Sequence, residues 1–292
     1  MTLPSAPARH DRPAGDHAAR CAEFRALHRP GRPLLLPNAW DHASAAALVA
    51  RGHRAIGTTS LGVAAAAGLP DGTAATRAET LALAGRLRRL PALLTVDVEG
   101  GFADDPAEVA ALAVELAGLG VVGINIEDGR PDGGLAAPEA VAERVAAVKA
   151  AVPDLFVNAR TDAWWLGVPE PLDEGLARAR AYRAAGADSV FAPGTVDPDT
   201  VRTLVAEVDA PLNVLYLPGG PGVAELGRLG VARVSTGSLL FRAALGGALS
   251  ALEEVRAGAA DTDGAGAPGR PTELPSYAQV QGLVEWGGEG EL

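Results

Sequence analysis

The stretch LLTVDVEGGFADDPAEVAALAVELAGLGVVGINIED, residues 93–128, decides the fold. Two short apolar runs, 93–99 and 121–128, flank a segment with a helical pattern. Asp105 followed by Pro106 is a helix start signal, and the GLG that follows the last turn is a stop signal. Continuous apolar runs are typical of strands in a parallel sheet that is covered on both faces. The stretch therefore predicts a strand–helix–strand unit.

The same unit repeats along most of the chain. Strands are expected at 33–39, 55–60, 93–99, 121–128, 155–162, 189–194, 211–217 and 232–237. Helices are expected at about 41–51, 76–89, 105–118, 138–151, 172–185, 198–208, 221–229 and 239–257. Eight such units without a long insertion predict a (β/α)₈ barrel, an α/β fold. A doubly wound sheet is the alternative, but PNAWDHAS after the first strand is not a Gly-rich phosphate loop.

Composition limits the class of protein. The chain has 292 residues, a formal net charge of −11 and one cysteine, Cys21. An acidic surface argues against nucleic acid and anionic membranes as partners. A single cysteine excludes an internal disulfide and suits the cytoplasm. No apolar run has the length of a membrane span. We expect a leader at 1–20, the catalytic barrel at 21–258, and a linker with a docking tail at 259–292.

Acidic residues lie where several predicted strands end. Asp97 and Glu99 point to the same face if the chain is extended, and buried like charges need a cation or hydrogen bonds. Glu127 ends the next strand, and Asp71 lies in the loop that follows the second. Oxygen ligands without Cys or His suit Mg²⁺ or Mn²⁺. We expect Asp97 to bind the metal directly and the other three carboxylates to hold its waters; a solvated strand end is the alternative.

Other polar residues share these strand ends, which converge on one rim of a barrel. Arg160 is expected to bind a substrate carboxylate through two hydrogen bonds, or else to pair with Asp162 or Glu127. Thr59 and Ser60 end the second predicted strand, where they would bind substrate or only cap the next helix. Asn213 and Tyr216 lie on the seventh strand.

Four segments together resemble the isocitrate lyase/phosphoenolpyruvate mutase superfamily. They are PNAWDHASAAALVARGHRAIGTTSLGVAAAAGLPDG, TVDVEGGFADDP, GVVGINIEDG and VNARTDA. The resemblance covers residues 34–249 and implies a (β/α)₈ barrel that binds Mg²⁺ and a 2-oxo acid or its enolate. It implies Asp97 as the direct metal ligand and Thr59, with the backbone at Ser60 and Leu61, as a carboxylate cradle. It also implies a homo-oligomer, a dimer or tetramer whose subunits exchange the last helix.

The chain departs from this family in two places. The loop GRPDGGLAAPEA lacks the Lys-Lys-x-Cys-Gly-His motif of isocitrate-type lyases and the Lys and Asn of phosphonate-handling members. Glu99 stands where the family usually has an aspartate. Without the loop cysteine, a metal-bound water, Glu99 or Tyr216 would have to act as base. We therefore expect an enzyme, a Mg²⁺-dependent lyase that cleaves or decarboxylates a small, oxaloacetate-like 2-oxo acid through an enolate.

Three alternatives stay open. One is cleavage or transfer at a P–C bond, as in carboxyphosphonoenolpyruvate or phosphoenolpyruvate mutase and phosphonopyruvate hydrolase. Another is hydroxymethyl transfer to a 2-oxo acid. The third is a protein that binds metal and 2-oxo acid without catalysis.

Overall fold

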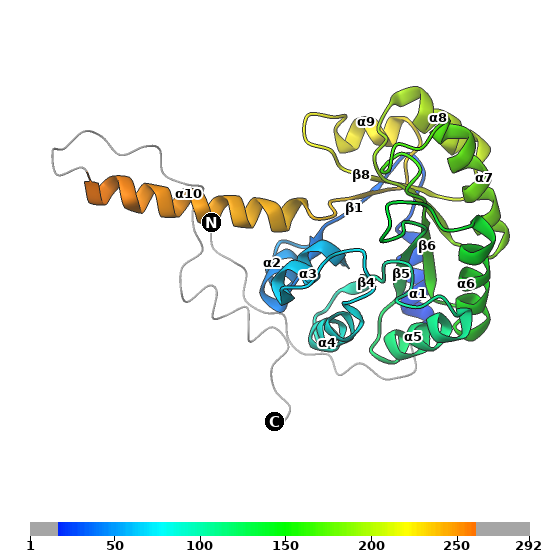
Figure 1. Cartoon of the computed structure of the whole chain (residues 1–292), viewed down its shortest axis with the longest axis horizontal. Coiled ribbons are helices and arrows are strands. Elements are labelled where there is room, and N and C mark those ends of the chain that lie inside the picture. Colours follow the sequence, from blue (N-terminus) through cyan, green and yellow to red (C-terminus); the bar gives the residue numbers. More distant parts are fainter. Residues whose placement is uncertain (1–16, 261–292) are drawn as a thin grey trace.

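The strands of the chain form one parallel barrel, as the sequence predicts (Figure 1). The computed structural model describes residues 17–260. Its strands are β1 (Leu34–Leu36), β2 (Asn38–Ala39), β3 (Ala55–Thr58), β4 (Leu93–Asp97), β5 (Gly123–Glu127), β6 (Phe156–Arg160), β7 (Ser189–Ala192), β8 (Leu212–Leu215) and β9 (Arg233–Ser235). Each expected strand is present, and only the first is divided.

Pro37 divides that first strand. β1 pairs with β9, whereas β2 pairs with β3, so the two halves join the ends of the sheet. Proline has no amide hydrogen to donate to a neighbouring strand. Its carbonyl still accepts a 2.9 Å hydrogen bond from the amide of Gly57. The sheet therefore closes at Pro37 into a barrel of eight positions.

Ten helices occur among the described residues. They are α1 (His17–Ala26), α2 (His42–Ala50), α3 (Ser60–Ala67), α4 (Arg77–Leu87), α5 (Pro106–Gly118), α6 (Pro138–Ala151), α7 (Pro171–Ala184), α8 (Pro198–Glu207), α9 (Val223–Arg228) and α10 (Leu239–Ala260). Helix α1 was not predicted, because its first residues, 17–20, fall in the segment expected to be a leader. Helix α3 was not predicted either, because the second strand ends at Thr58 and a helix begins two residues later. The rest of the leader and nearly all of the tail lie outside the described residues.

The two faces of each strand meet different environments. Outward residues such as Val96, Ile126 and Val157 pack in a large apolar cluster with α4, α5 and α6. The lower interior is also apolar, because Phe24 of α1 packs edge-on against Phe156, with ring centroids 5.2 Å apart. Helix α1 thus closes the end of the barrel where the strands begin.

Higher in the barrel, the inward residues change from apolar to polar and then to charged. Asn125, Asn158 and Ser189 form a buried hydrogen-bonded row on β5, β6 and β7, with oxygen–nitrogen and oxygen–oxygen distances of 2.8 Å. Asp97 and Arg160 stand where β4 and β6 end. The acidic and basic residues thus gather at the carboxyl ends of the strands, where barrel enzymes carry their sites.

Helix α10 extends away from the barrel (Figure 1). Four large apolar side chains on it are exposed: Leu245, Leu249, Leu252 and Val255. In the part of the chain that the structure describes, no helix combines the length and the apolar character needed to cross a bilayer.

Candidate active site

Arg160 is the centre of the charged rim. Its Nη1 lies 2.6 Å from Oε2 of Glu127, the neighbouring residue on β5, and its Nε donates a 2.7 Å hydrogen bond to Asp162. The guanidinium carbon also lies 5.7 Å from the centre of the Phe191 ring. The structural pairing considered for Arg160 is therefore present, and the planar group is fixed in orientation.

Burial makes the rim carboxyls hard to ionise. It raises the pKa of Asp97 to about 6, a change that Arg160 opposes and that Asp71 and Glu99 reinforce. It also raises the pKa of Glu127 well above its ordinary value, again opposed by Arg160, with Asp97 adding to the rise. Buried like charges of this kind are relieved by a cation. The single guanidinium of Arg160 therefore does not balance the negative charge that Asp97 and Glu127 would carry at the rim if both were ionised.

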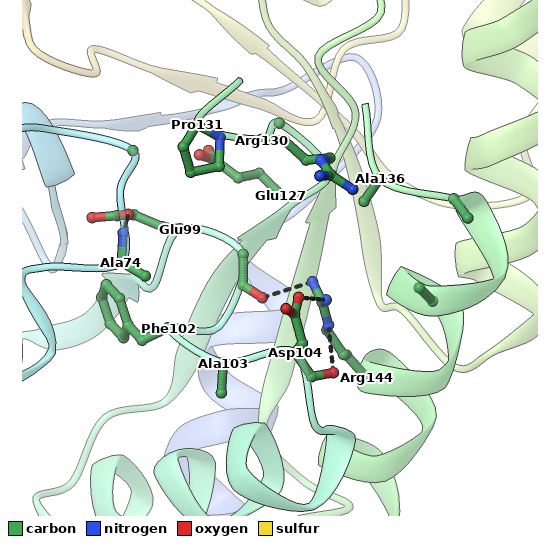
Figure 2. A pocket seen from close by; sticks show the side chains of 15 residues that line it. Ala74, Glu99, Phe102, Ala103, Asp104, Glu127, Arg130, Pro131, Ala136 and Arg144 are labelled. Carbon is green, nitrogen blue, oxygen red and sulfur yellow. Dashed lines mark hydrogen bonds and ion pairs between the residues drawn. The ribbon is translucent and has the colours of Figure 1, made fainter. Parts of the chain in front are cut away.

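Glu99 has a different environment from the other carboxylates. Its backbone has a φ of +50°, a left-handed conformation that is uncommon outside glycine. Its carboxylate accepts hydrogen bonds from the amide of Ala74 at 2.8 Å and from the hydroxyl of Thr76 at 2.9 Å (Figure 2 shows it directed toward Ala74). Both oxygens are therefore used to hold the loop between α3 and α4.

Asp71 lies in this same loop. It is exposed, yet near enough to Asp97 and Glu127 to raise the pKa of both carboxyls. The described residues contain no group of three His, Cys, Asp or Glu side chains already placed around one metal position. Mg²⁺ takes one or two carboxylates directly and keeps several waters. One half-buried carboxylate with two further acids nearby therefore fits Mg²⁺, although not as a closed protein cage.

Helix α3 begins beside Asp97. Thr58 accepts a 2.9 Å hydrogen bond from the Asp97 amide, and α3 starts two residues later at Ser60. Thr59 is the N-cap but its side chain makes no capping bond. The first helical hydrogen bond comes from Val63 to Thr59, so the amides of Ser60 and Leu61 are not used within the helix. Such amides favour an anion.

Two candidates come from the seventh predicted strand: Asn213 lies on β8, Tyr216 directly follows it, and their side chains face opposite ways. Tyr216 packs with Val214 and Leu212 in the apolar cluster between the strands and the outer helices. Asn213 is fully buried, and its side chain accepts a 3.1 Å hydrogen bond from Ser235. Residues an odd number of positions apart along an extended chain point to opposite faces, and Asn213 and Tyr216 are three positions apart. Only Asn213 is therefore directed toward the barrel interior.

Asp128 directly follows Glu127, the last residue of β5. In the structure it is fully buried and accepts hydrogen bonds from the Tyr182 hydroxyl at 2.7 Å, from Arg178 at 3.1 Å and from the Asp162 amide at 2.8 Å. It thus ties α7 to the residue that orients Arg160. An acid at the end of a strand was visible in the sequence, but its partners on α7 lie about fifty residues away.

A pocket of about 620 Å³ opens outward from the rim, between the loops that follow β4 and β5 (Figure 2). Its charged lining is supplied by Glu99, Asp104, Glu127, Arg130 and Arg144. Arg144 is held by Gly100 and Asp104 (Figure 2). The loop lacking the lyase motif forms one wall, so space for a substrate adjoins the rim.

Comparisons with known proteins identify the family of the chain. The family model described as phosphoenolpyruvate phosphomutase matches residues 24–256. An uncharacterized protein of Mycobacterium tuberculosis is 44% identical over 80% of this chain and 89% of its own. The oxaloacetate decarboxylase of Ectopseudomonas mendocina is 35% identical over 61% of this chain and 63% of its own.

A solved structure is similar to this chain in both sequence and fold. A Burkholderia cenocepacia protein, provisionally assigned as a phosphonomutase, is 40% identical, with a TM-score of 0.75 over 80% of this chain and 98% of its own. The family match spans most of the chain and includes every strand of the barrel. This chain therefore belongs to the phosphoenolpyruvate phosphomutase family of the PEP mutase/isocitrate lyase superfamily.

Proposed function

We propose that the chain is a Mg²⁺-dependent lyase that decarboxylates, or cleaves a C–C bond of, a small 2-oxo acid similar to oxaloacetate. The observation that carries the proposal is the rim, where Arg160 fixes Glu127 beside Asp97 and burial leaves a deficit of positive charge. A relative that is an oxaloacetate decarboxylase supports the substrate class.

Each rim residue has a defined part in this proposal. Asp97 would hold Mg²⁺ directly, and Glu127 and Asp71 would hold it through waters. Bound Mg²⁺ would supply Lewis-acid stabilisation for negative charge that develops on the keto oxygen. Glu99 would position the loop that carries Asp71. It would not act as the base, because both of its carboxylate oxygens already accept hydrogen bonds.

The substrate carboxylate has two sets of donors. One set is the amides of Ser60 and Leu61 at the start of α3, which follow Thr58, the residue whose hydroxyl accepts a hydrogen bond from the Asp97 amide. Among residues 17–260, the acid partners of Arg160 bind its Nη1 and Nε, which leaves Nη2 for the same substrate carboxylate. Decarboxylation needs little beyond such an electron sink, since no acid has to protonate the leaving carbon dioxide. That requirement matches a loop without Cys, His or Lys.

The test is a screen of the purified chain with Mg²⁺ against oxaloacetate, phosphonopyruvate, 2-methylisocitrate and dimethylmalate, following pyruvate or glyoxylate release. Mg²⁺ decarboxylates oxaloacetate slowly by itself, so matched reactions contain Mg²⁺ without protein and Mg²⁺ with Asp97→Asn. Oxaloacetate turnover that EDTA and Asp97→Asn abolish supports the proposal. Turnover of phosphonopyruvate alone would instead assign P–C chemistry, which the similarity to the Burkholderia protein favours. If the chain binds oxalate in the presence of Mg²⁺ but turns over none of the four compounds, it is a protein that binds metal and 2-oxo acid without catalysis.

We further propose that the chain forms a homo-oligomer in which α10 packs on a second copy. The spacing of Leu245, Leu249 and Leu252 places them on one side of the helix. They are 51%, 65% and 48% exposed, although leucine is usually buried. The apolar stripe continues to Val255, and the helix leaves its own barrel (Figure 1).

A further inference from the structure

An arginine lies inside the barrel, beneath the rim. Arg233, the first residue of β9, is fully buried. Its Nη2 donates a 3.2 Å hydrogen bond to Asn125 on β5, four places away in the sheet, so the side chain crosses the barrel interior. Its Nε donates to Ser235 at 2.9 Å, which directs the guanidinium toward the carboxyl ends of the strands.

Two buried donor groups beside this network have no hydrogen-bond partner. They are Nη1 of Arg233 and Nδ2 of Asn213. The residues are direct neighbours in the β8–β9 pairing, and Ser235 joins their side chains by accepting from Arg233 and donating to Asn213. We call Arg233 and Asn213 the donor floor. A donor without an acceptor in a buried position costs free energy.

The other buried arginines have acidic partners. Arg178 pairs with Asp128, Arg144 with Asp104, and the nearly buried Arg160 with Glu127. For Arg233, residues 17–260 provide no Asp or Glu within ion-pair distance. Burial lowers its pKa to about 9. A buried guanidinium whose hydrogen-bond partners, Ser235 and Asn125, are both neutral is a strong site for an anion.

The donor floor lies directly below the candidate active site. Asn125, the acceptor for Arg233, is the β5 neighbour of Asp97. Asp97 is also near enough to Arg233 to favour its charged form. We propose that Arg233 and Asn213 bind the second carboxylate of a four-carbon 2-oxo dicarboxylate, whose first carboxylate and keto oxygen lie at the rim. This inference rests on the proposed function in its C–C cleavage form, because it places the 2-oxo end at Asp97 and holds the second carboxylate too firmly for that group to leave as carbon dioxide.

The chemistry of the floor selects this ligand. Nη1 of Arg233 and Nδ2 of Asn213 offer hydrogens only, so the group that satisfies both is an acceptor, and its negative charge offsets that of the guanidinium. Out of contact with solvent, these bonds are stronger than similar bonds at the surface. A substrate with one carboxylate, such as pyruvate, would leave the floor unsatisfied. The floor therefore makes the site selective for dicarboxylates.

Lactate and malate test the inference. Both are unreactive 2-hydroxy acids with the same metal-binding end, and malate adds one carboxylate. Calorimetry with saturating Mg²⁺ gives the ratio of their dissociation constants for each protein. The proteins compared are the wild-type chain, Asn213→Asp, Arg233→Met and Arg180→Met. Arg180→Met is the control, because Arg180 is an exposed arginine on α7. Asn213→Asp keeps the size of the side chain and gives Arg233 an acidic partner, so we expect it to fold even where Arg233→Met does not.

Wild-type protein and Arg180→Met are expected to bind malate at least tenfold more tightly than lactate, and Asn213→Asp to reduce that preference below threefold. Equal affinities in the wild type, or a preference that survives Asn213→Asp, would overturn the inference. Oxalate binding with Mg²⁺ tests the proposed function separately. If oxalate does not bind, the melting temperature with malate and without Mg²⁺ still tests the floor: a rise in the wild type that Asn213→Asp abolishes supports it, and no rise refutes it.

Discussion

The carboxylate of Glu99 accepts a 2.8 Å hydrogen bond from the amide of Ala74, which lies across the rim in the loop that carries Asp71. The hydroxyl of Thr76 donates to the other carboxylate oxygen. Glu99 follows β4 in a left-handed backbone conformation, and its side chain is almost completely buried. The acid two residues after Asp97 thus fixes the loop that brings a further carboxylate toward Asp97.

We predict that Glu99→Ala loosens this loop. The Ala74 amide and the Thr76 hydroxyl would lose their acceptor in a buried place, which costs about 1–3 kcal/mol per group. Hydrogen exchange of residues 70–76 should become faster, and Mg²⁺ should bind about tenfold more weakly because Asp71 is less well placed. Glu108→Ala, at an exposed site on α5, is the matched control. Unchanged exchange in the loop would contradict the positioning role of Glu99.

Mg²⁺ affinity should depend on pH through Asp97. Burial raises the pKa of this carboxyl to about 6 in the metal-free protein, so protons compete with the metal below that pH. Affinity should be nearly constant above about pH 7 and should fall by up to tenfold per pH unit below pH 6, more steeply if Glu127 protonates as well. Calorimetric titration between pH 5 and pH 8 measures this. Asp97→Asn should bind weakly and lose most of the dependence, whereas an equally steep profile in that variant would assign the proton elsewhere.

Much of the barrel was predictable because its outer core is built from local patterns. Runs such as 93–99 and 121–128 carry Val and Ile on the outward face, and their helices begin with Asp–Pro or Ala–Pro pairs. Helix α1 was missed because its sequence, HAARCAEFRA, consists mainly of alanine and charged residues, and only Cys21 and Phe24 are buried. Its packing depends on the barrel end that it closes.

The rim acids were predictable because they end strands, whereas their partners were not. The sequence placed Glu99 near Asp97 but did not show that a positive φ turns its carboxylate toward Ala74. Nor did the apolar strands draw attention to their inward polar residues, Asn125 and Arg233. These residues pair across the barrel, 108 positions apart, and no local pattern reports such a contact.

The exposed stripe of α10 predicts a change in assembly. Leu249→Glu with Leu252→Glu puts two charges where a second copy is proposed to pack, and each would have to be desolvated there. We expect light scattering after size exclusion to show a smaller species, while circular dichroism of the barrel is unchanged. Arg256→Glu, also exposed on α10, is the control for charge alone. The same mass for all three proteins would refute packing through this stripe.

His28 should make the barrel sensitive to acid. It lies between α1 and the barrel, with its ring stacked 4.2 Å from that of Phe156, and burial lowers its pKa from 6.5 to about 3. Between these two values the unfolded chain binds a proton at His28 and the folded chain does not. The free energy of unfolding therefore falls as the pH falls from about 6.5 toward 3, by up to about 1.4 kcal/mol per pH unit from this group. His28→Gln removes the titration but keeps a donor for the Phe24 carbonyl, 2.9 Å away in the wild type. Urea unfolding of both proteins between pH 4 and pH 7 should give the wild type the steeper loss of stability at equal m-values, whereas equal slopes would mean that His28 is protonated in the folded barrel.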